Sequence, residues 1–322
     1  MKVSIIIPAL NASKTVQACL TACVQQVLPA TVQTEIILVD DGSTDNTAEL
    51  AQAFDIRLLR HKAARGAAAA RNTGIAAAQG EVILFTDADC VPRQNWVAEM
   101  LRPFTNPTVM GGKGIYATEQ PQLTARFVQI EYEDKYDLLR QQPAIDFIDT
   151  YSAAYRAAVL RACGGFDERI RYVEDQDLSF RLAEQGHVMV FQPTAVVLHQ
   201  HSDSLGRYVR KKFMIGYWKS QIMRRYPRRV VKDSHTPQVL KLQMGLVALT
   251  LGFLALSLIF PLASLMALLL LALFFLTTLP FLGKTWTKDR AVCLAAPFFL
   301  WCRALALGLG YAWGMLRPQP GV

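Results

Sequence analysis

The sequence lacks the glycine-rich turn that a dinucleotide-binding enzyme carries after its first strand. Its first apolar run, residues 3–7, is followed by the segment from Pro8 to Ser13, which contains no glycine. This absence excludes a dinucleotide-dependent oxidoreductase, although the sheet of such an enzyme would show a similar periodicity. The run also has no small-x-small cleavage site and only one lysine before it, so it predicts a buried strand and not a signal peptide.

Cysteine is scarce and scattered along the chain. The six cysteines show no Cys-x-x-Cys spacing and no nearby histidine partners of the zinc type. Cys19 and Cys23 lie one helical turn apart, and we expect them to be small buried hydrophobic residues. The pattern is typical of a protein in a reducing compartment.

Charge is absent from one long stretch. No charged residue occurs from Met244 to Leu282, which is enough for two bilayer crossings of about 20 residues each. Pro261 lies near its middle and predicts a hairpin between spans at residues 243–260 and 262–282. A further apolar stretch, residues 291–316, contains Arg303, so we expect either a third span with its arginine facing a bundle interior or snorkelling, or an interfacial helix.

Positive charge is concentrated just before these spans. The chain has a formal charge of +8, and residues 207–241 hold eleven Lys or Arg and the single acid Asp233, which leaves the remainder at −2. Basic residues beside a first span mark the cytoplasmic side, and the interleaved aromatic residues suit an interfacial helix on anionic lipid. We expect a multi-pass protein of the inner or plasma membrane with a cytoplasmic catalytic domain. Nucleic-acid binding is the competing explanation, and the adjoining spans disfavour it.

Residues 1–205 predict a single α/β domain. Apolar, β-branched runs alternate with Ala-rich helical stretches, the first helix being capped by Asn11 or Ser13. This alternation predicts a parallel, doubly wound sheet. The strands are expected at residues 3–7, 35–39, 56–59 and 82–86.

The order changes after residue 90. A helix is expected at 96–104, a strand at 109–116 and a long amphipathic helix at 123–139. Later elements are expected as strands at 147–153, 188–190 and 195–198, and as helices at 156–162 and 176–184. This second half predicts an irregular acceptor-side subdomain. The expected parts of the chain are the domain 1–205, a basic amphipathic interfacial segment 206–242 and a transmembrane region 243–316.

Three strand-like or apolar runs end in pairs of acids: Asp40-Asp41, Asp87 with Asp89, and Glu174-Asp175. Ligands of an open α/β sheet bind outside the carboxyl ends of its strands, so these acids are expected to line one crevice. Packed carboxylates repel unless a cation or a proton lies among them. The pattern therefore predicts a divalent metal and a phosphate-bearing substrate.

Each acid pair has a chemical and a structural explanation. Asp87 and Asp89 stand two residues apart at a strand end, where they could hold Mg²⁺ or Mn²⁺ against a diphosphate, or form a solvated turn. Asp40 and Asp41 could bind a nucleoside or cap the following helix. Arg71 could bridge a phosphate or form a surface ion pair.

Glu174 and Asp175 open a predicted helix. A carboxylate at a helix N-terminus is stabilised as an anion, which favours a general base that is ionised at neutral pH. Such a base would take the proton of an acceptor hydroxyl as that hydroxyl attacks an anomeric carbon. Plain helix capping is the alternative.

In order and spacing, these residues resemble the family 2 glycosyltransferases over about residues 1–200. The matching positions are Pro8 after the first strand, residues 39–45 (VDDGSTD), residues 70–72 (ARN), residues 87–89 (DAD), residues 164–167 (GGFD) and residues 174–175 (ED). The resemblance implies an α/β fold of the GT-A type, which is Rossmann-like, followed here by C-terminal transmembrane helices. It also implies a nucleotide-diphosphate sugar donor, a divalent metal (Mg²⁺ or Mn²⁺) and inversion at the anomeric carbon.

The resemblance also carries roles over to single residues. Asp175 is the implied base, and Gly165, Phe166, Asp167 and Glu174 belong to the acceptor side. His199 lies where some members present a metal or diphosphate ligand, and a structural role is the alternative. The implied donor-binding residues are Pro8, Asp40, Asp41, Arg71 and Asp87. The implied metal ligands are Asp89, Asp87 and His199.

Two motifs depart from the family pattern. Residues 62–66 (KAARG) replace the Asn and Gly that members commonly carry ahead of the Arg71 motif, so Arg65 takes a phosphate role or none. Gln221-Ile222-Met223-Arg224 matches a motif of processive synthases, but Arg225 stands where those carry Trp.

We therefore expect an inverting glycosyltransferase that moves one sugar from a nucleotide-diphosphate donor to a lipid-linked or membrane-proximal acceptor. A uridine-linked donor is expected from its frequency in the family. A processive polysaccharide synthase is the alternative within the family. A non-catalytic nucleotide-sugar-binding membrane scaffold is the alternative of another class, and its expected signature, loss of Asp89 or Asp175, is not seen. A channel or transporter is disfavoured because two or three spans with one intramembrane charge are too few.

Overall fold

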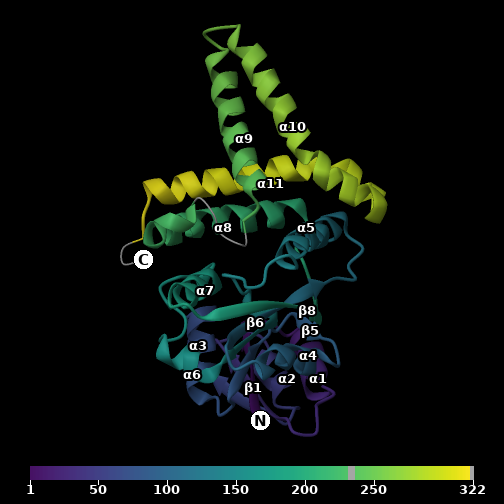
Figure 1. The fold of residues 1–322 in the computed structure, drawn as a ribbon, viewed down its shortest axis with the longest axis vertical. Helices are drawn as coiled ribbons and strands as arrows, with labels where there is room; N and C mark the ends of the chain where they lie inside the picture. The colour runs from purple at the N-terminus through teal and green to yellow at the C-terminus, as the bar shows by residue number, and fades with distance from the viewer. Residues whose placement is uncertain (231–235, 320–322) are drawn as a thin grey trace. The chain divides into compact units, whose positions relative to one another are not determined.

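The computed structural model describes residues 1–230 and 236–319, which form two compact units (Figure 1). The first unit comprises Met1–Glu119 and Tyr136–Gln200. The second comprises Gln120–Lys135 and the chain from His201 onward. The acid clusters belong to the first unit, and the basic and apolar segments belong to the second.

A parallel sheet in the order β3-β2-β1-β4 forms the first half of unit one, as predicted. Both faces of such a sheet are covered, and the consecutive Ile5, Ile6 and Ile7 are accordingly all buried. The strands are β1 Lys2–Ala9, β2 Gln33–Asp40, β3 Arg57–Arg60 and β4 Val82–Phe85. The helices between them are α1 Val16–Val24, α2 Thr47–Ala51 and α3 Ala67–Ala77.

The second half of unit one extends this sheet, so the prediction of an appended irregular subdomain was wrong. The full order is β3-β2-β1-β4-β7-β6-β8-β5, a mixed sheet in which β7 pairs antiparallel with β4. The pairing satisfies backbone groups that an open edge of β4 would leave exposed. The further strands are β5 Cys90–Pro92, β6 Val109–Ala117, β7 Ala153–Arg156 and β8 Val188–His199. The helices are α4 Trp96–Leu101, α6 Ala157–Ala162 and α7 Glu174–Glu184.

Two strand predictions in this half need correction. The strand expected at 147–153 lies instead at Ala153–Arg156, because the chain forms a 3₁₀ turn at Thr150–Ser152 first. The two strands expected at 188–190 and 195–198 are one strand, β8. Its pairing with β6 shifts register between Lys113 and Ile115, and this bulge accommodates the polar and proline-containing residues 192–194.

Unit two is built from helices. Its apolar core includes Phe127, Tyr208, Phe281 and Phe299, and the rings of Phe127 and Phe299 lie 4.8 Å apart. The helices are α8 Leu205–Arg225, α9 Gln238–Leu256, α10 Ala263–Lys288 and α11 Arg290–Leu316. The helix α5, Leu123–Leu139, begins in this unit and ends in unit one.

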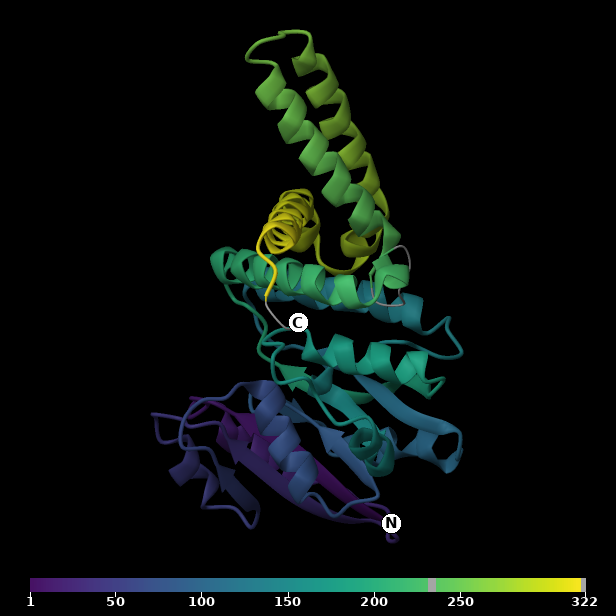
Figure 2. The ribbon, with the colours of Figure 1, turned by 90° about the vertical axis from the view of Figure 1, so that its left-hand side faces the viewer.

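Two described helices, α9 and α11, are long and apolar enough to cross a membrane. The two parts of α10, residues 263–276 and 279–288, meet at a bend of 43° and make a third candidate if they form one span. The turn between α9 and α10 contains Pro261, where the sequence predicted a hairpin. Within this unit, Figures 1 and 2 show α9 and α10 side by side and α11 running crosswise to them.

Candidate functional site

The carboxyl ends of β1, β2 and β4 place the first acids. Pro8 pairs with Val39 and Ala9 with Asp40, while Ile6 pairs with Phe85, two residues before Asp87. The parallel register therefore brings Pro8, Asp40 and Asp87 to the same edge of the sheet. This edge is the position at which open α/β sheets bind their ligands.

Asp40 and Asp41 both hold the loops around them. The Asp40 side chain is fully buried, accepts a hydrogen bond from the Ser43 N–H at 2.9 Å and lies 3.0 Å from the Arg60 Nε. Asp41 accepts hydrogen bonds from the Arg65 and Gly66 N–H groups at 2.9 and 2.7 Å. Gly66 caps α3, so Asp41 anchors the start of that helix. A nucleoside role for these two acids stays a prediction.

Arg71 connects two of the predicted acid clusters. It is buried, and its guanidinium donates to Asp87 Oδ1 at 2.8 Å and to Glu174 Oε1. It also lies over the Phe166 ring, 5.6 Å from its centroid. Arg71 is thus a buried bridge and not a surface ion-pair residue. Removing one member of such a buried pair typically costs about 3–5 kcal/mol.

Asp89 and His199 come together through strand pairing. In the β5–β8 ladder Cys90 lies opposite His199, and this register places the His199 Nε2 3.6 Å from the Asp89 Oδ2. Asp89 is 47% exposed, whereas His199 is buried. Ligand atoms of Asp89, Cys90 and His199 all lie within 4.8 Å of one another. Asp87 does not belong to this group and is bound by Arg71 instead.

The chemistry of this group fits a divalent ion. The Asp89 carboxylate is a hard oxygen ligand that suits Mg²⁺ or Mn²⁺, and His199 adds an imidazole nitrogen. Burial raises the pKa of the Cys90 thiol well above its usual value. A soft sulfur ligand also suits Mg²⁺ or Mn²⁺ less well than an oxygen ligand does. The half-exposed Asp89 leaves room for ligands from a substrate. The fitting donors are therefore Asp89 and His199.

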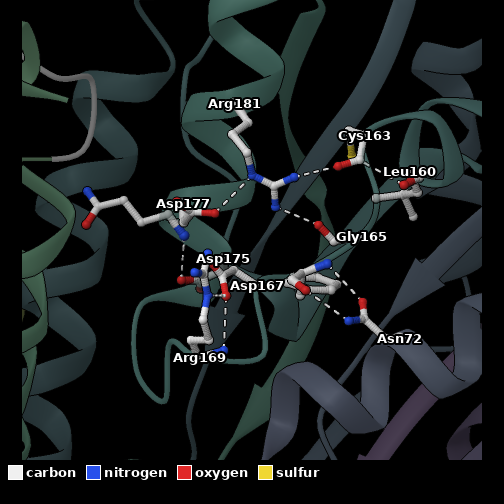
Figure 3. Close-up of polar contacts among 11 residues, drawn as sticks. Asn72, Leu160, Cys163, Gly165, Asp167, Arg169, Asp175, Asp177 and Arg181 are labelled. Carbon is white, nitrogen blue, oxygen red and sulfur yellow. Dashed lines mark hydrogen bonds and ion pairs between the residues drawn. The ribbon is translucent and has the colours of Figure 1, made fainter. Parts of the chain in front are cut away.

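The loop 164–167 is fixed from both sides (Figure 3). Gly164 and Gly165 have φ angles of 78° and 69°, and a Cβ on Gly165 would lie 2.5 Å from the Asn72 Oδ1. Asn72 donates to the Phe166 carbonyl and accepts from the Phe166 N–H, at 2.9 and 2.8 Å. Phe166 itself is buried, edge-on to Phe85. It therefore shapes the loop from within.

The rest of the loop is held by two arginines (Figure 3). Arg181 donates to the carbonyls of Cys163 and Gly165 at 2.7 and 2.6 Å and to Asp177 at 2.9 Å. Asp167 accepts from Arg169, whose Nη2 lies 2.7 Å from Oδ2. An acceptor role for Gly165 to Asp167 stays a prediction, and the structure shows why the motif needs its glycines.

The base candidate Asp175 sits behind a strained residue. Val173 has φ 57° and ψ 27°, the left-handed region that a β-branched side chain rarely adopts. This conformation starts α7 and places Glu174 and Asp175 in its first turn. Such strain persists only where the surroundings over-determine the backbone, and it is common at active sites.

The pKa of Asp175 is raised well above its usual value. Burial is the largest cause, followed by the charges of Glu174 and Asp149, and Arg71 only partly offsets them. The sequence led us to expect that the helix N-terminus stabilises the ionised form, whereas burial and the neighbouring acids shift the pKa in the opposite direction. Loss of water and the neighbouring acids outweigh the helix dipole. A carboxyl with a raised pKa is suited to act as a general base near neutral pH.

Three residues near the candidate site were not predicted from the sequence: His61, Lys113 and Asp149. His61 follows β3 and lies with its Nδ1 2.6 Å from Asp41 and its Nε2 2.9 Å from Thr73. The buried Lys113 forms an ion pair with Asp149, one of the two acids that raise the pKa of Asp175. The only local signal was a histidine directly after a strand, since the other partners lie far apart in the sequence.

A family model described as glycosyl transferase family 2 matches residues 4–164, half of the chain. The chain belongs to glycosyl transferase family 2. The matched range contains most of β1, all of β2 to β7, and the residues Arg71, Asp87 and Asp89. The names of the family's members that match support a glycosyltransferase enzyme.

Two family relatives illustrate the range of similarity. The pre-mycofactocin glycosyltransferase of Mycobacterium tuberculosis is 31% identical over 60% of this chain and 43% of its own. The Escherichia coli UDP-Glc:alpha-D-GlcNAc-diphosphoundecaprenol beta-1,3-glucosyltransferase WfgD is 37% identical over 31% of this chain and 38% of its own. The chain thus spans less than half of the length of these two relatives.

A solved structure matches nearly the whole chain. It is the mannosyltransferase PcManGT from Pyrobaculum calidifontis in complex with GDP-Man and Mn²⁺, with a TM-score of 0.65 at 19% identity. The match covers 98% of this chain and 88% of that one. At this identity the similarity shows the fold.

Proposed function

We propose that the protein transfers a single sugar, with inversion, from a nucleotide-diphosphate sugar to the hydroxyl of a lipid-linked acceptor. The observation that carries this proposal is the Arg71 bridge. One buried guanidinium holds the donor-side acid Asp87 and the acid Glu174, which adjoins the base candidate Asp175. This bridge supports a site in which the donor and the base would lie close together. Family frequency favours a uridine-linked donor.

In the proposed reaction Asp175 accepts the proton of the acceptor hydroxyl as its oxygen bonds to the anomeric carbon. The bond from that carbon to the diphosphate oxygen breaks, and the nucleoside diphosphate leaves. The raised pKa of Asp175 makes its carboxylate a stronger base toward the acceptor hydroxyl than an ordinary carboxylate. Asp89 and His199 would hold Mg²⁺ or Mn²⁺, whose charge offsets that of the diphosphate.

The remaining predicted site residues fit around this centre. Asp40, Asp41 and Pro8 would lie beside the nucleoside at the end of β1 and β2. The loop from Gly165 to Asp167, with Glu174, would border the acceptor. Asp40 and Asp41 contribute by fixing loops, since their carboxylates accept hydrogen bonds from the N–H groups of Ser43, Arg65 and Gly66.

The candidate membrane spans support the choice of acceptor. Two or three helices are long and apolar enough to cross a bilayer, and a basic segment precedes them. The name of WfgD states that this relative uses a diphosphoundecaprenol-linked acceptor. By the same chemistry, a lipid-linked sugar at the cytoplasmic surface is the acceptor that we propose here.

A processive synthase is less well supported. Its motif residues in α8 are engaged elsewhere: Gln221 donates to the Gly314 carbonyl at 2.7 Å and Arg224 to the Met315 carbonyl at 2.6 Å. Both side chains thus hold α11, and Arg225 stands where Trp is expected. This favours a single transfer.

The test uses the full-length protein in detergent with a set of nucleotide sugars, Mg²⁺ or Mn²⁺, and polyprenyl-diphosphate sugars as acceptors. We expect one sugar added per acceptor, abolished by EDTA. Asp89→Asn should lose metal-dependent donor turnover, and the exposed Asp55→Asn is the matched control. Donor binding without any transfer would instead indicate a nucleotide-sugar-binding scaffold, and long products would indicate a processive synthase.

A further inference from the structure

The helix α11 is long enough to cross a bilayer, but its partner α8 is not suited to do so. With 27 residues, α11 would extend about 40 Å. The helix α8 carries seven Lys or Arg in 21 residues, among them the exposed Arg207, Arg210 and Lys211. Charges of this number are excluded from hydrocarbon and suit the membrane surface. The position of α11 can therefore be inferred from how it packs on α8.

α11 packs on α8 at backbone contact. Gly310 approaches Phe213 so closely that a Cβ would lie 2.1 Å from its carbonyl oxygen. Gly216 of α8 approaches the Leu307 carbonyl in the same way, at 2.3 Å. A Cβ on Gly314 would meet the Ser220 hydroxyl at 2.1 Å. The close contact thus extends along both helices. The depth of α11 in a membrane is therefore set by the depth of α8.

Charged or polar groups hold α11 at its start, middle and end. At the start, Asp289 caps the helix and pairs with Arg126 of α5 at 2.7 Å. In the middle, the buried Arg303 donates to Glu131 of α5 at 3.3 Å and to Gln243 at 2.8 Å. At the end, Gln221 and Arg224 bind its last carbonyls. Three points spread along α11 are thus tied to the charged helices α5 and α8.

The opposite face of α11 is apolar and exposed. Its large side chains recur at helical spacing, and both ends carry an arginine stacked on a tryptophan: Arg290 on Trp286 and Arg317 on Trp313. Arginine and tryptophan are typical of the headgroup level of a membrane. The exposed residues of this face are Leu294, Phe298, Leu309, Trp313 and Leu316.

We infer that α11 lies in the plane of the membrane surface, with α8 beneath it and this apolar face in contact with the acyl chains of an anionic bilayer. Among the described residues, only the α9–α10 hairpin then enters the hydrocarbon. Its tip exposes large apolar side chains in succession, with Leu258 at 89% and Leu262 at 80%. Both ends of the chain consequently face the same side. The inference rests on the membrane attachment proposed above and not on the transfer reaction.

The first experiment maps sidedness in the full chain. Short epitopes are placed before Met1, within the hairpin turn between Ile259 and Phe260, or after Val322, and protease access is compared in right-side-out and inverted membrane vesicles. We expect both ends to be cleaved in one vesicle type and the hairpin tip in the other. A C-terminal epitope on the side of the tip would show that α11 spans and would overturn the inference. A tip on the side of both ends would overturn it as well, because the hairpin would not cross.

The second experiment measures depth along α11. Spin labels are attached at Leu294→Cys or Leu309→Cys in a chain with its native cysteines replaced. The depth of each label is measured from its accessibility to a lipid-soluble and to a water-soluble paramagnetic reagent. The two positions lie on one face, 15 residues and about 22 Å apart along the helix. Equal, shallow depths are expected, whereas depths that differ by most of this length would overturn the inference. Neither measurement depends on sugar transfer, so a failed transfer assay leaves both results interpretable.

Discussion

The two units each bury a carboxyl group in opposite surroundings. In unit one, Asp175 lies among other acids, Glu174 and Asp149, and its pKa is raised. In unit two, Glu131 is bonded to Lys212 at 2.7 Å and to Arg303 at 3.3 Å, and their charges hold its pKa well below the usual value despite burial. One acid is under-compensated, and the other is paired with two cations.

This difference separates a group arranged for chemistry from one arranged for structure. Because its negative charge is not fully balanced by nearby cations, Asp175 can readily exchange a proton, and this imbalance lowers the stability of the fold. The pairing of Glu131 keeps it ionised and joins α5, α8 and α11 through one polar cluster. A buried acid is therefore interpretable only together with its counter-charges.

The largest expected effect comes from removing the charge of Asp175. Asp175→Asn should slow transfer by about 10²- to 10⁴-fold, the usual contribution of a general base, and leave donor binding measurable. It should also raise the thermal midpoint, because ionising an acid whose folded pKa is raised destabilises the fold as pH rises through that pKa. Transfer rates, donor titration and thermal unfolding check this prediction. Full activity in the variant would place the base elsewhere.

Glu131→Gln should have the opposite effect on stability. It leaves Lys212 and Arg303 buried without their carboxylate, which should cost about 3–5 kcal/mol. Glu133→Gln, two residues along the same helix, removes a partly exposed ion pair with Lys288, and the new amide oxygen can still accept the hydrogen bond from Gln129, so it should cost less than about 1 kcal/mol. Thermal unfolding of the full chain in detergent compares the two. Equal losses would mean that Glu131 has no special role.

Acid should weaken the same cluster. The folded pKa of Glu131 lies below its unfolded value, so its contribution to stability is present above the unfolded pKa and is lost as pH falls through the folded one. The difference in thermal midpoint between wild type and Glu131→Gln should therefore shrink as the pH is lowered. A difference that stays constant with pH would argue against a charge-based role.

The smallest expected effect is on the pH profile. Asp149→Asn removes one of the two acids that raise the pKa of Asp175, so the acidic limb of kcat/KM should move to lower pH. Some loss of stability should accompany it, because Lys113 loses its partner. The pH at which the limb falls does not depend on how much of the protein is folded, so the loss of stability does not obscure the shift. The control is Asp137→Asn, because Asp137 is half exposed and paired with Arg140. A limb that does not move would remove Asp149 from the tuning of the base.

Sequence patterns predicted the elements whose signals are local. The runs around Ile5, Ile37 and Leu84 are apolar, β-branched or both, and they correctly predicted parallel strands. Pro261 likewise predicted the hairpin turn. The position of β7 was missed because the apolar residues before Ala153 looked equally strand-like. Which of them pairs with β4 depends on tertiary contacts that no short window contains.

The same limit applies to the site. Asp89 and His199 were named from the sequence, but their approach follows from a β5–β8 register that spans more than 100 residues. The direction of the Asp175 pKa was missed because a helix N-terminus is visible in sequence and burial is not. Arg71 was left open for a similar reason, since both of its partners lie on other elements.

The shared guanidinium of Arg71 has a consequence for the order of events. A donor whose diphosphate binds the Arg71 guanidinium in competition with Asp87 would change the field that Arg71 exerts on Asp175. Occupation of the donor side and proton affinity on the acceptor side are then two ligand equilibria with a common coupling free energy. Reciprocity requires that protonation at Asp175 alter donor affinity by the same factor, so that the affinity of the donor itself depends on pH.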